Sequence, residues 1–309
     1  MYNQPYSNTV FTLSGYFSDD NMDASELSNA YTTARRRTAV QKTIDGEKYY
    51  RYELCAAINT GLAKQEIPIP TNVPIQITFN RANSAKSLLQ ITKSKDGNPI
   101  TYDEPVVKII SPSLAVYFVE SAKADSFYGK AKLYDVSVPF VEYNIRRELL
   151  LDSVSNHTIK MFEGPLPSYV VVGIMKPSVF EGDIEYSGFK FERHGLEVAD
   201  FQVDNTSIAG YPMTLKHGNV IEYYMNYLQT TNRFDNVYAN GALSYTNFNE
   251  SNFLVFINLK GENLTHGQAV LKLKFTNVLS EKMYLVFMPV YEKAIIYDSY
   301  FNASVESAK

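Results

Sequence analysis

The feature that most constrains this chain is a two-residue alternation of apolar and polar side chains, clearest in residues 75–80 and 271–276. Successive side chains of a β-strand point to opposite faces, so this period predicts strands with one buried face and one solvated face. The segment Tyr169–Met175 is apolar throughout, which predicts a strand that is covered on both faces. We therefore expect antiparallel sheets that pack on one another in layers.

Further strand candidates follow at short intervals. They are residues 9–14, 48–57, 87–93, 105–119 with a break at Pro112, 137–147, 157–163, 196–203, 253–257 and 282–291. Asp45-Gly46 and Asp96-Gly97 predict hairpin turns or loops, and the two prolines of Gly164–Pro167 predict a bend between two strands. Strands do not alternate regularly with helices, which argues against a parallel, doubly wound sheet.

Two segments predict helices, and one of them marks a domain boundary. Residues 220–229 place three tyrosines, a valine and a leucine near one helical face, and residues 120–133 contain no proline and one glycine. The second segment separates two groups of strands, so we expect an N-terminal domain at residues 1–127 and a C-terminal domain at residues 128–309. The later group holds about eight strands, the number of a jelly-roll sandwich.

The predicted fold is therefore all-β, with antiparallel jelly-roll sandwiches and a few short connector helices. The group of strands before the boundary numbers only about five, short of the eight of a complete jelly roll. We expect a double jelly roll whose first member is partial or irregular.

The charge balance and the single cysteine limit the classes of partner. The chain has 29 basic and 33 acidic residues and a formal net charge of −4, so a broad cationic surface for nucleic acid is not expected. Cys55 stands alone, which excludes an internal disulfide and fits a reducing compartment. The first residues lack a signal-peptide pattern, and no apolar stretch approaches the roughly 20 residues that span a bilayer. We expect neither secretion through a signal peptide nor a membrane span.

Motifs that carry chemistry are sparse. Four histidines lack the spacing of a metal site: His157, His194, His217 and His266. The sequence has no phosphate-binding loop, dinucleotide fingerprint or nucleophile elbow. Three groups of carboxylates are close in sequence: Asp19 with Asp20, Asp183 with Glu185, and Glu197 with Asp200. A β-sandwich glycosidase needs two carboxylates about 5 to 9 Å apart, but solvated loop carboxylates are the simpler interpretation. We predict no enzyme, no catalytic residue, no metal and no cofactor.

One basic run stands out, Arg35, Arg36 and Arg37, in a segment at residues 23–43 that predicts a loop. Three adjacent guanidinium groups can pair with carboxylates of a neighbouring subunit, with phosphates of nucleic acid, or with water alone. A short run on an acidic chain gives little phosphate affinity, so an intersubunit contact is the preferred interpretation. No specific nucleic-acid site is predicted. Arg146 and Arg147, at the end of a predicted strand, are interpreted as solvated charges or edge protection.

Several short segments occur in an order that is typical of one protein family. They are Arg35, Ile69–Ile75, Phe79–Ala82, Ser111–Leu114, Phe162–Pro167 leading into Val170–Ile174, Gly182–Phe191, Leu196–Pro212, Gly267–Phe275, Leu285-Val286 and Tyr291–Asp298. In this order they resemble the hexon-like double-jelly-roll major capsid protein of Polinton (Maverick) elements and adintoviruses. The closest parts are a Val-Val-Gly strand and a Phe-x-Phe segment, and the last three segments match a paired terminal hairpin in spacing.

The chain departs from that family in places. Ser187–Phe191 stands where the family has Asn-Pro-Phe-Asn-Phe, and Ser299–Phe301 replaces an Arg-Asn pair. Such capsid proteins are also longer, with extra strands ahead of the point where this chain starts. The resemblance is thus to a divergent member, a fragment, a processed form or a reduced relative.

The resemblance implies a structural role in a virion. Three chains with two jelly rolls each would form a pseudo-hexagonal homotrimeric capsomer, which contacts neighbouring capsomers and penton or minor capsid proteins in an icosahedral shell. A rival from another class stays open because the chain has 24 tyrosines. A β-sandwich binding module, such as a carbohydrate- or receptor-binding spike or fibre head, uses exposed aromatic rings as a platform.

Overall fold

The computed structural model describes the C-terminal part of the chain almost continuously. It covers residues 133–307 except 181–190, 216–219, 232–242, 251, 263 and 301. In the N-terminal part it describes residues 40–44, 47–51, 75–79 and 109–116 and a few single positions, among them Cys55 and Gly61. Arg35, Arg36 and Arg37 and the predicted strands at 9–14 and 87–93 lie outside the described residues. The division at residue 127 stays a prediction.

The first of two facing sheets is organised around its longest strand, β12 (Met283–Tyr297), and is called the β12 sheet. The first half of β12 pairs antiparallel with β4 (Arg146–Leu150) on one side and with β6 (Tyr169–Met175) on the other. β10 (Val255–Asn258) pairs with β6 and forms an edge. The second half of β12 pairs with β3 (Val136–Tyr143) and β13 (Ala303–Ser307).

The second sheet is organised around β11 (His266–Phe275) and is called the β11 sheet. β11 lies between β5 (Asn156–Pro165) and β7 (Leu196–Val203), antiparallel to both. The two-residue strands β8 (Thr206–Ser207) and β9 (Met213–Thr214) pair with the outer side of β7.

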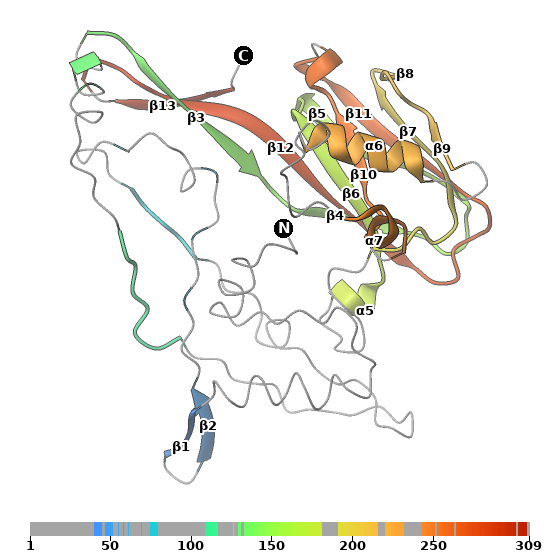
Figure 1. The fold of residues 1–309 in the computed structure, drawn as a ribbon, viewed down its shortest axis with the longest axis horizontal. Coiled ribbons are helices and arrows are strands. Elements are labelled where there is room, and N and C mark those ends of the chain that lie inside the picture. The colour runs from blue at the N-terminus through green and yellow to red at the C-terminus, as the bar shows by residue number, and fades with distance from the viewer. Residues whose placement is uncertain are drawn as a thin grey trace.

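The order of these strands is that of a jelly roll. One sheet runs β4-β12-β6-β10, and the other runs β5-β11-β7 with β8 and β9 together at its edge. If β4 is counted as the first strand and β12 as the last, consecutive strands alternate between the two sheets except at β7, β8 and β9, which all belong to the β11 sheet. This is the pattern of the Greek-key connections of a jelly roll. The predicted all-β antiparallel fold is confirmed, and the C-terminal part forms the expected jelly-roll sandwich (Figure 1).

The core lies between the inner faces of the two sheets. Alternate residues of β11, from Ala269 to Phe275, are buried and face alternate residues of β12, from Met283 to Phe287. Burying one such side chain contributes about 1.5–3 kcal/mol. The two-residue alternation at 271–276 therefore predicted this strand and its buried face correctly.

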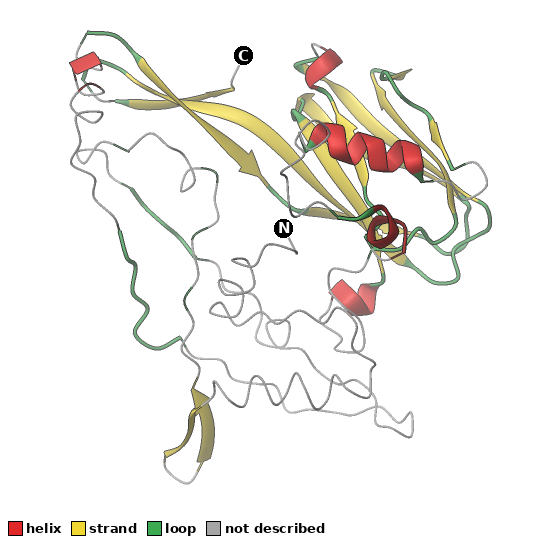
Figure 2. Cartoon of the chain, viewed as in Figure 1, coloured by secondary structure: helices red, strands yellow, loops and turns green. Residues whose placement is uncertain are grey.

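Helices are few and lie in the connections (Figure 2). The helix predicted at 220–229 is confirmed as α6 (Ile221–Thr230), with Tyr223 and Tyr227 buried. The chain also forms α5 (Pro177–Phe180), α7 (Tyr245–Glu250) and the 3₁₀ turn η3 (Lys260–Glu262), which the sequence did not predict. None of the helices in the described part of the chain is long and apolar enough to cross a membrane.

The N-terminal part differs from expectation at two places and agrees at one. β1 (Val40–Ile44) and β2 (Glu47–Arg51) form an antiparallel hairpin around Asp45-Gly46, as that turn predicts, although β1 extends into the predicted loop. Residues 75–79 and 109–116 are not strands, and Phe79 is 74% exposed. The prediction of strands there was wrong, because side-chain alternation does not supply the neighbouring strand that a ladder needs.

The C-terminal end needs a second correction. The segments 267–275 and 285–298 resembled a paired terminal hairpin, but β11 and β12 belong to different sheets and do not pair. The terminal hairpin is formed by β12 and β13, which the sequence did not predict. β12 also continues to Tyr297, six residues beyond the predicted end at Tyr291.

Candidate functional site: an apolar sheet face and a projecting arm

The outer face of the β11 sheet is polar. Lys272 and Lys274 project from β11 and are exposed, between half-buried polar residues of β7 and exposed polar residues of β5. The Lys274 Nζ lies 2.9 Å from a carboxylate oxygen of Glu197. Asp200 accepts hydrogen bonds from Ser207 Oγ at 2.8 Å and Gln202 Nε2 at 2.6 Å. The outer face of the β11 sheet therefore has the polar side chains that are typical of a surface in contact with water.

The outer face of the β12 sheet is apolar, in contrast. Tyr284, Val286 and Met288 alternate with the inward residues of β12, and Val171 lies beside Met288 on β6. All four side chains are half-buried. A sheet face of aliphatic and aromatic residues is stabilised when it is covered, since roughly 25 cal/mol is gained per Å² of apolar surface removed from water. The polar outer face of the β11 sheet therefore suits contact with water, whereas the apolar outer face of the β12 sheet suits contact with protein.

A close contact on this apolar face joins two segments that carried the family resemblance. Gly173 of β6 lies under the ring of Phe191, and a Cβ atom at Gly173 would come within 2.7 Å of Phe191 Cε1 and 3.0 Å of Leu254 Cδ2. The backbone holds Phe191 in place, because Phe253 N donates to Phe191 O at 3.0 Å. The glycine of the Val-Val-Gly strand and the last phenylalanine of Phe-x-Phe are thus packing partners.

Arg147 lies at one end of the apolar face. Its guanidinium carbon is 4.5 Å from the ring centre of Phe180 and 4.9 Å from that of Tyr284, and the two rings pack edge to face. Such cation–π contacts contribute about 0.5–1 kcal/mol at exposed sites. Arg147 and Arg146 begin the edge strand β4 rather than end a strand, and Arg147 has a specific ring contact in addition to its charge.

The second half of β12, with β3 and β13 on either side, forms an arm that extends away from the sandwich (Figure 1). β12 is 15 residues long, or about 50 Å at the rise of an extended strand. Val138, Ile295 and Tyr297 are buried together on one face of the arm, with Phe140 beside them. Lys293 forms an ion pair with Glu142 across the β12–β3 ladder.

The end of the arm presents apolar side chains on an ordered turn. Leu133, Tyr134 and Tyr300 are 73%, 72% and 84% exposed. The Asp298 carboxylate accepts hydrogen bonds from Tyr300 N, Asn302 N and Asn302 Nδ2, each at 2.8 Å. These bonds, that from the Asn302 side chain above all, lower the pKa of Asp298. One carboxylate therefore bonds to both Tyr300 and Asn302.

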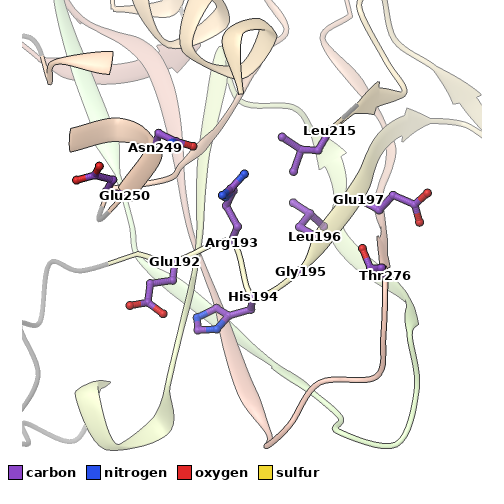
Figure 3. Close-up of a pocket in the computed structure, with 10 residues that line it drawn as sticks. All are labelled: Glu192, Arg193, His194, Gly195, Leu196, Glu197, Leu215, Asn249, Glu250 and Thr276. Carbon is purple, nitrogen blue, oxygen red and sulfur yellow. The ribbon is translucent and has the colours of Figure 1, made fainter. Parts of the chain in front are cut away.

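A pocket of about 540 Å³ opens beside the start of β7 (Figure 3). It is lined by Glu192, Arg193, His194, Gly195, Leu196, Glu197, Leu215, Asn249, Glu250 and Thr276. His194 has a φ of 50° in the turn before β7, and the Asn249 Oδ1 is buried without a hydrogen-bond partner. The described residues place no three His, Cys, Asp or Glu side chains together in a way that could hold a metal ion.

Of the polar groups that the sequence singled out, His194 and Glu197 line this pocket, whereas Asp200, His157 and His266 do not. Glu197 and Asp200 have different partners on the β11 sheet. His157 is buried on β5, and His266 is exposed on β11. Asp19, Asp20, Asp183, Glu185 and His217 lie outside the described residues. The features that the sequence missed are the apolar outer face and the arm, although the continuous apolar stretch at 169–175 was a signal for the first of them.

Comparison with solved structures finds partial matches to capsid structures, at low identity and low TM-score. No protein family description and no curated protein matches the chain. The crystal structure of PBCV-1 VP54, fitted into a reconstruction of the virophage Sputnik, is 8% identical with a TM-score of 0.39, over 62% of this chain and 55% of that one. The Sputnik virophage structure is 11% identical with a TM-score of 0.34, over 56% and 39%. The mavirus major capsid protein is 9% identical with a TM-score of 0.34, over 56% and 42%.

This chain therefore spans between 39% and 55% of the length of those three chains. The resemblance to Polinton and adintovirus proteins stays a prediction.

Proposed function

We propose that the chain is a structural subunit of a viral or virus-like-element capsid, without catalytic activity, and that it is located in the virion. The observation that carries this proposal is the strand order of the two sheets, which is the jelly-roll order. Viral capsid proteins use that architecture, as do lectins and cupins, so the fold by itself does not decide the function. The ordered resemblance of segments to Polinton and adintovirus major capsid proteins favours the capsid role.

The chemistry of the two sheet faces supports an assembly role. The β11 sheet suits water, whereas the outer face of the β12 sheet is apolar around Val171, Val286 and Met288. Subunit interfaces have an apolar centre surrounded by a polar rim, and Arg147 with Tyr284 is a suitable rim pair. We assign this face to contact with a second copy of the chain in a homotrimeric capsomer. Neighbouring capsomers and penton or minor capsid proteins would then complete the shell.

The binding-module alternative is less well supported by the aromatic residues. The tyrosines of α6 are used inside the fold: Tyr223 donates to Met213 O at 3.0 Å, and the ring of Tyr227 stacks on Phe248. A glycan platform needs a group of exposed rings. In the described part of the chain, the most exposed tyrosines are Tyr134 and Tyr300 at the end of the arm. A glycan array with a bound sugar would favour that alternative.

The test is the mass of the full chain in solution, measured by light scattering at micromolar concentration. We expect a trimer or larger assembly for the natural sequence and a shift toward monomer for Met288→Glu, which places a charge in the apolar face. Burying an unpaired carboxylate costs several kcal/mol, enough to reduce the association constant by a hundredfold or more.

Thr158→Glu is the matched control, because it adds the same charge to the exposed face of the β11 sheet beside Lys272. It should leave the mass unchanged. A natural chain that stays monomeric would refute the capsid proposal, and a Met288→Glu chain that still forms trimers would remove this face from the interface.

A further inference from the structure

An open sheet has edges whose backbone N–H and C=O groups lack a neighbouring strand. Natural proteins protect such edges with charges, bulges, short strands or covering segments. The edges of this sandwich differ in how well they are protected, and one of them is left open.

Most of the edges are protected. At β10, the Phe256 carbonyl accepts hydrogen bonds from Tyr211 Oη at 3.1 Å and from the Asn226 side chain of α6. At β5, the register shifts opposite Ala269 and Val270, which marks a bulge, and the edge carries the ion pair of Lys160 and Glu163. The edge opposite β5 consists of the two-residue strands β8 and β9. On the arm, the backbone of Gly61 closely approaches that of Val141 in β3.

The edge of β13 has none of these features. All five residues from Ala303 to Ser307 are exposed, and Val305 is 58% exposed. Within the described residues, β13 pairs with β12 alone, in an unbroken register from Tyr297↔Ala303 to Lys293↔Ser307. The strand contains no lysine, no proline and no bulge. It therefore offers a flat row of backbone donors and acceptors to a further strand.

Two hydrogen bonds identify the groups that point outward. On the side of β12 that faces β6 and β13, Ser168 N donates to Val290 O at 2.8 Å, and Asp298 N donates to Asn302 O at 3.1 Å. The even-numbered residues of β12 therefore direct their backbone groups toward β13. Antiparallel ladders alternate hydrogen-bonded and non-bonded pairs, so Ser304 and Glu306 bond to β12. The N–H and C=O groups of Ala303, Val305 and Ser307 point away from it.

We propose that β13 pairs antiparallel with β13 of a second copy, around a two-fold axis at Val305. In that register the backbone groups of Val305 bond to those of Val305 in the second copy, and Ala303 and Ser307 exchange bonds in both directions. All the outward groups are satisfied at once. The partner is a second copy because the strand is complementary to itself under this rotation, as an isologous interface requires.

The side chains agree with this register. Val305 meets its own equivalent on the face of the arm that carries Ile295 and Val138, so an apolar face becomes continuous across the axis. On the opposite face, Ser304 lies across from Glu306 of the second copy, and a hydroxyl can donate to a carboxylate there. No two charges of the same sign are directly opposite, which is the arrangement that cross-strand pairing disfavours.

This contact deepens the proposed capsid function and, for its place in a shell, rests on it. A closed trimer cannot tile a surface unless it has a second kind of contact. A two-fold contact at the end of an arm would join one trimer to the next.

The first experiment tests the register by a cross-link. In a full chain with Cys55→Ser, Val305→Cys places two thiols across the axis, with Cα atoms about 5.5 Å apart in a hydrogen-bonded pair. That separation is within the range of a disulfide. We expect a covalent dimer on a non-reducing gel under mild oxidation. Val278→Cys is the matched control, because Val278 is 57% exposed and lies away from β13. At least a tenfold excess of dimer at position 305 supports the pairing, and equal yields overturn it.

The second experiment removes one outward donor. Val305→Pro deletes an N–H that β12 does not use, and proline is tolerated on edge strands, so the β12–β13 hairpin should remain. Val305→Thr keeps the N–H and is the control. Under electron microscopy and light scattering, we expect Val305→Pro to keep the trimer mass and to lose larger assemblies, whereas Val305→Thr keeps both.

The outcomes separate the two proposals. If Val305→Pro forms arrays as the natural chain does, the β13 contact is refuted while the capsid role stands. If the Val305→Cys chain forms the cross-link but the natural chain forms neither trimers nor arrays, the capsid role is refuted while the contact stands.

Discussion

At the residue scale, Gly173 shows how one missing side chain supports the apolar face. The ring of Phe191 occupies the space where a Cβ atom would be, and Leu254 Cδ2 lies 3.0 Å from that position. Glycine normally weakens a central strand, because it has no side chain to pack and loses more backbone entropy. Here an aromatic ring from another segment compensates for it, which gives a physical reason for two of the residues that carried the family resemblance.

We therefore expect Gly173→Ala to destabilise the domain by about 1–3 kcal/mol, the usual cost of overpacking. Urea unfolding followed by circular dichroism measures this. Adding Phe191→Ala should recover part of the loss, so the two changes should be non-additive. Gly129→Ala is the control, because nothing lies within 4 Å of a Cβ atom there. Additive effects of the pair would contradict the packing explanation.

The environment of His157 leads to a prediction about the pH dependence of stability. Its side chain is 9% exposed, its ring packs edge to face on Phe275 with the centres 5.6 Å apart, and its Nε2 is buried without a partner. Burial lowers the pKa of His157 below its ordinary value of 6.5, although a hydrogen bond with the Val154 backbone opposes this in part. The folded state therefore binds the proton less readily than the unfolded state does.

The sign of the pH dependence follows from this difference. The stability is fully present above about pH 6.5 and falls as the pH falls through that value toward the lowered pKa, because the unfolded chain takes up the proton first. Each tenfold difference in proton affinity is worth about 1.4 kcal/mol. We expect His157→Leu to reduce the pH dependence of the urea midpoint between pH 5 and 6.5. The control His266→Gln, at an exposed position on β11, should leave that pH dependence unchanged. An unaltered slope in His157→Leu would contradict this account.

At the element scale, the strands that sequence reasoning located best are those in the middle of the sandwich. Residues 169–175 and 196–203 match β6 and β7 at both ends, because each strand has one face in the core and its apolar side chains give a clear pattern. Residues 75–79 alternate just as clearly, but no described strand lies beside them. Alternation of apolar and polar residues therefore did not indicate strand pairing there. β13 was missed because Ala-Ser-Val-Glu-Ser has little pattern of its own and becomes a strand by pairing with β12.

The candidate surface was predictable in part. The apolar segment 169–175 indicated cover on both faces, and the β11 sheet supplies it on one face only. The apolar outer face is recognised only when β6 is placed beside Val286 and Met288 of β12. That placement depends on the strand register, which the pattern of one segment does not determine. The arm could not be anticipated, because β12 was expected to end where it leaves the sandwich.

At the scale of the whole molecule, the described parts combine a polar sheet, an apolar sheet face and an arm with one unprotected edge. These three surfaces suit different neighbours, namely solvent, a copy within the trimer and a copy beyond it. The basic run Arg35–Arg37 is a fourth candidate contact, and it can be tested in the same assembly even though it lies outside the described residues.

We expect replacement of Arg35, Arg36 and Arg37 by serine to weaken trimer formation and leave folding nearly unchanged. Guanidinium groups that bind carboxylates in a bidentate manner form stronger pairs than typical surface ion pairs, which contribute about 0.2–1 kcal/mol each. The matched control replaces Lys160, Lys272 and Lys274 by serine, since it removes the same charge from the polar face of the β11 sheet. Light scattering at physiological salt should show a lower trimer fraction for the arginine variant alone. High salt should weaken the natural trimer toward that level, because the screening length falls from about 8 Å at physiological salt to about 3 Å at 1 M salt. Equal trimer fractions in both triple variants would show that the arginines are solvated loop charges and take no part in assembly.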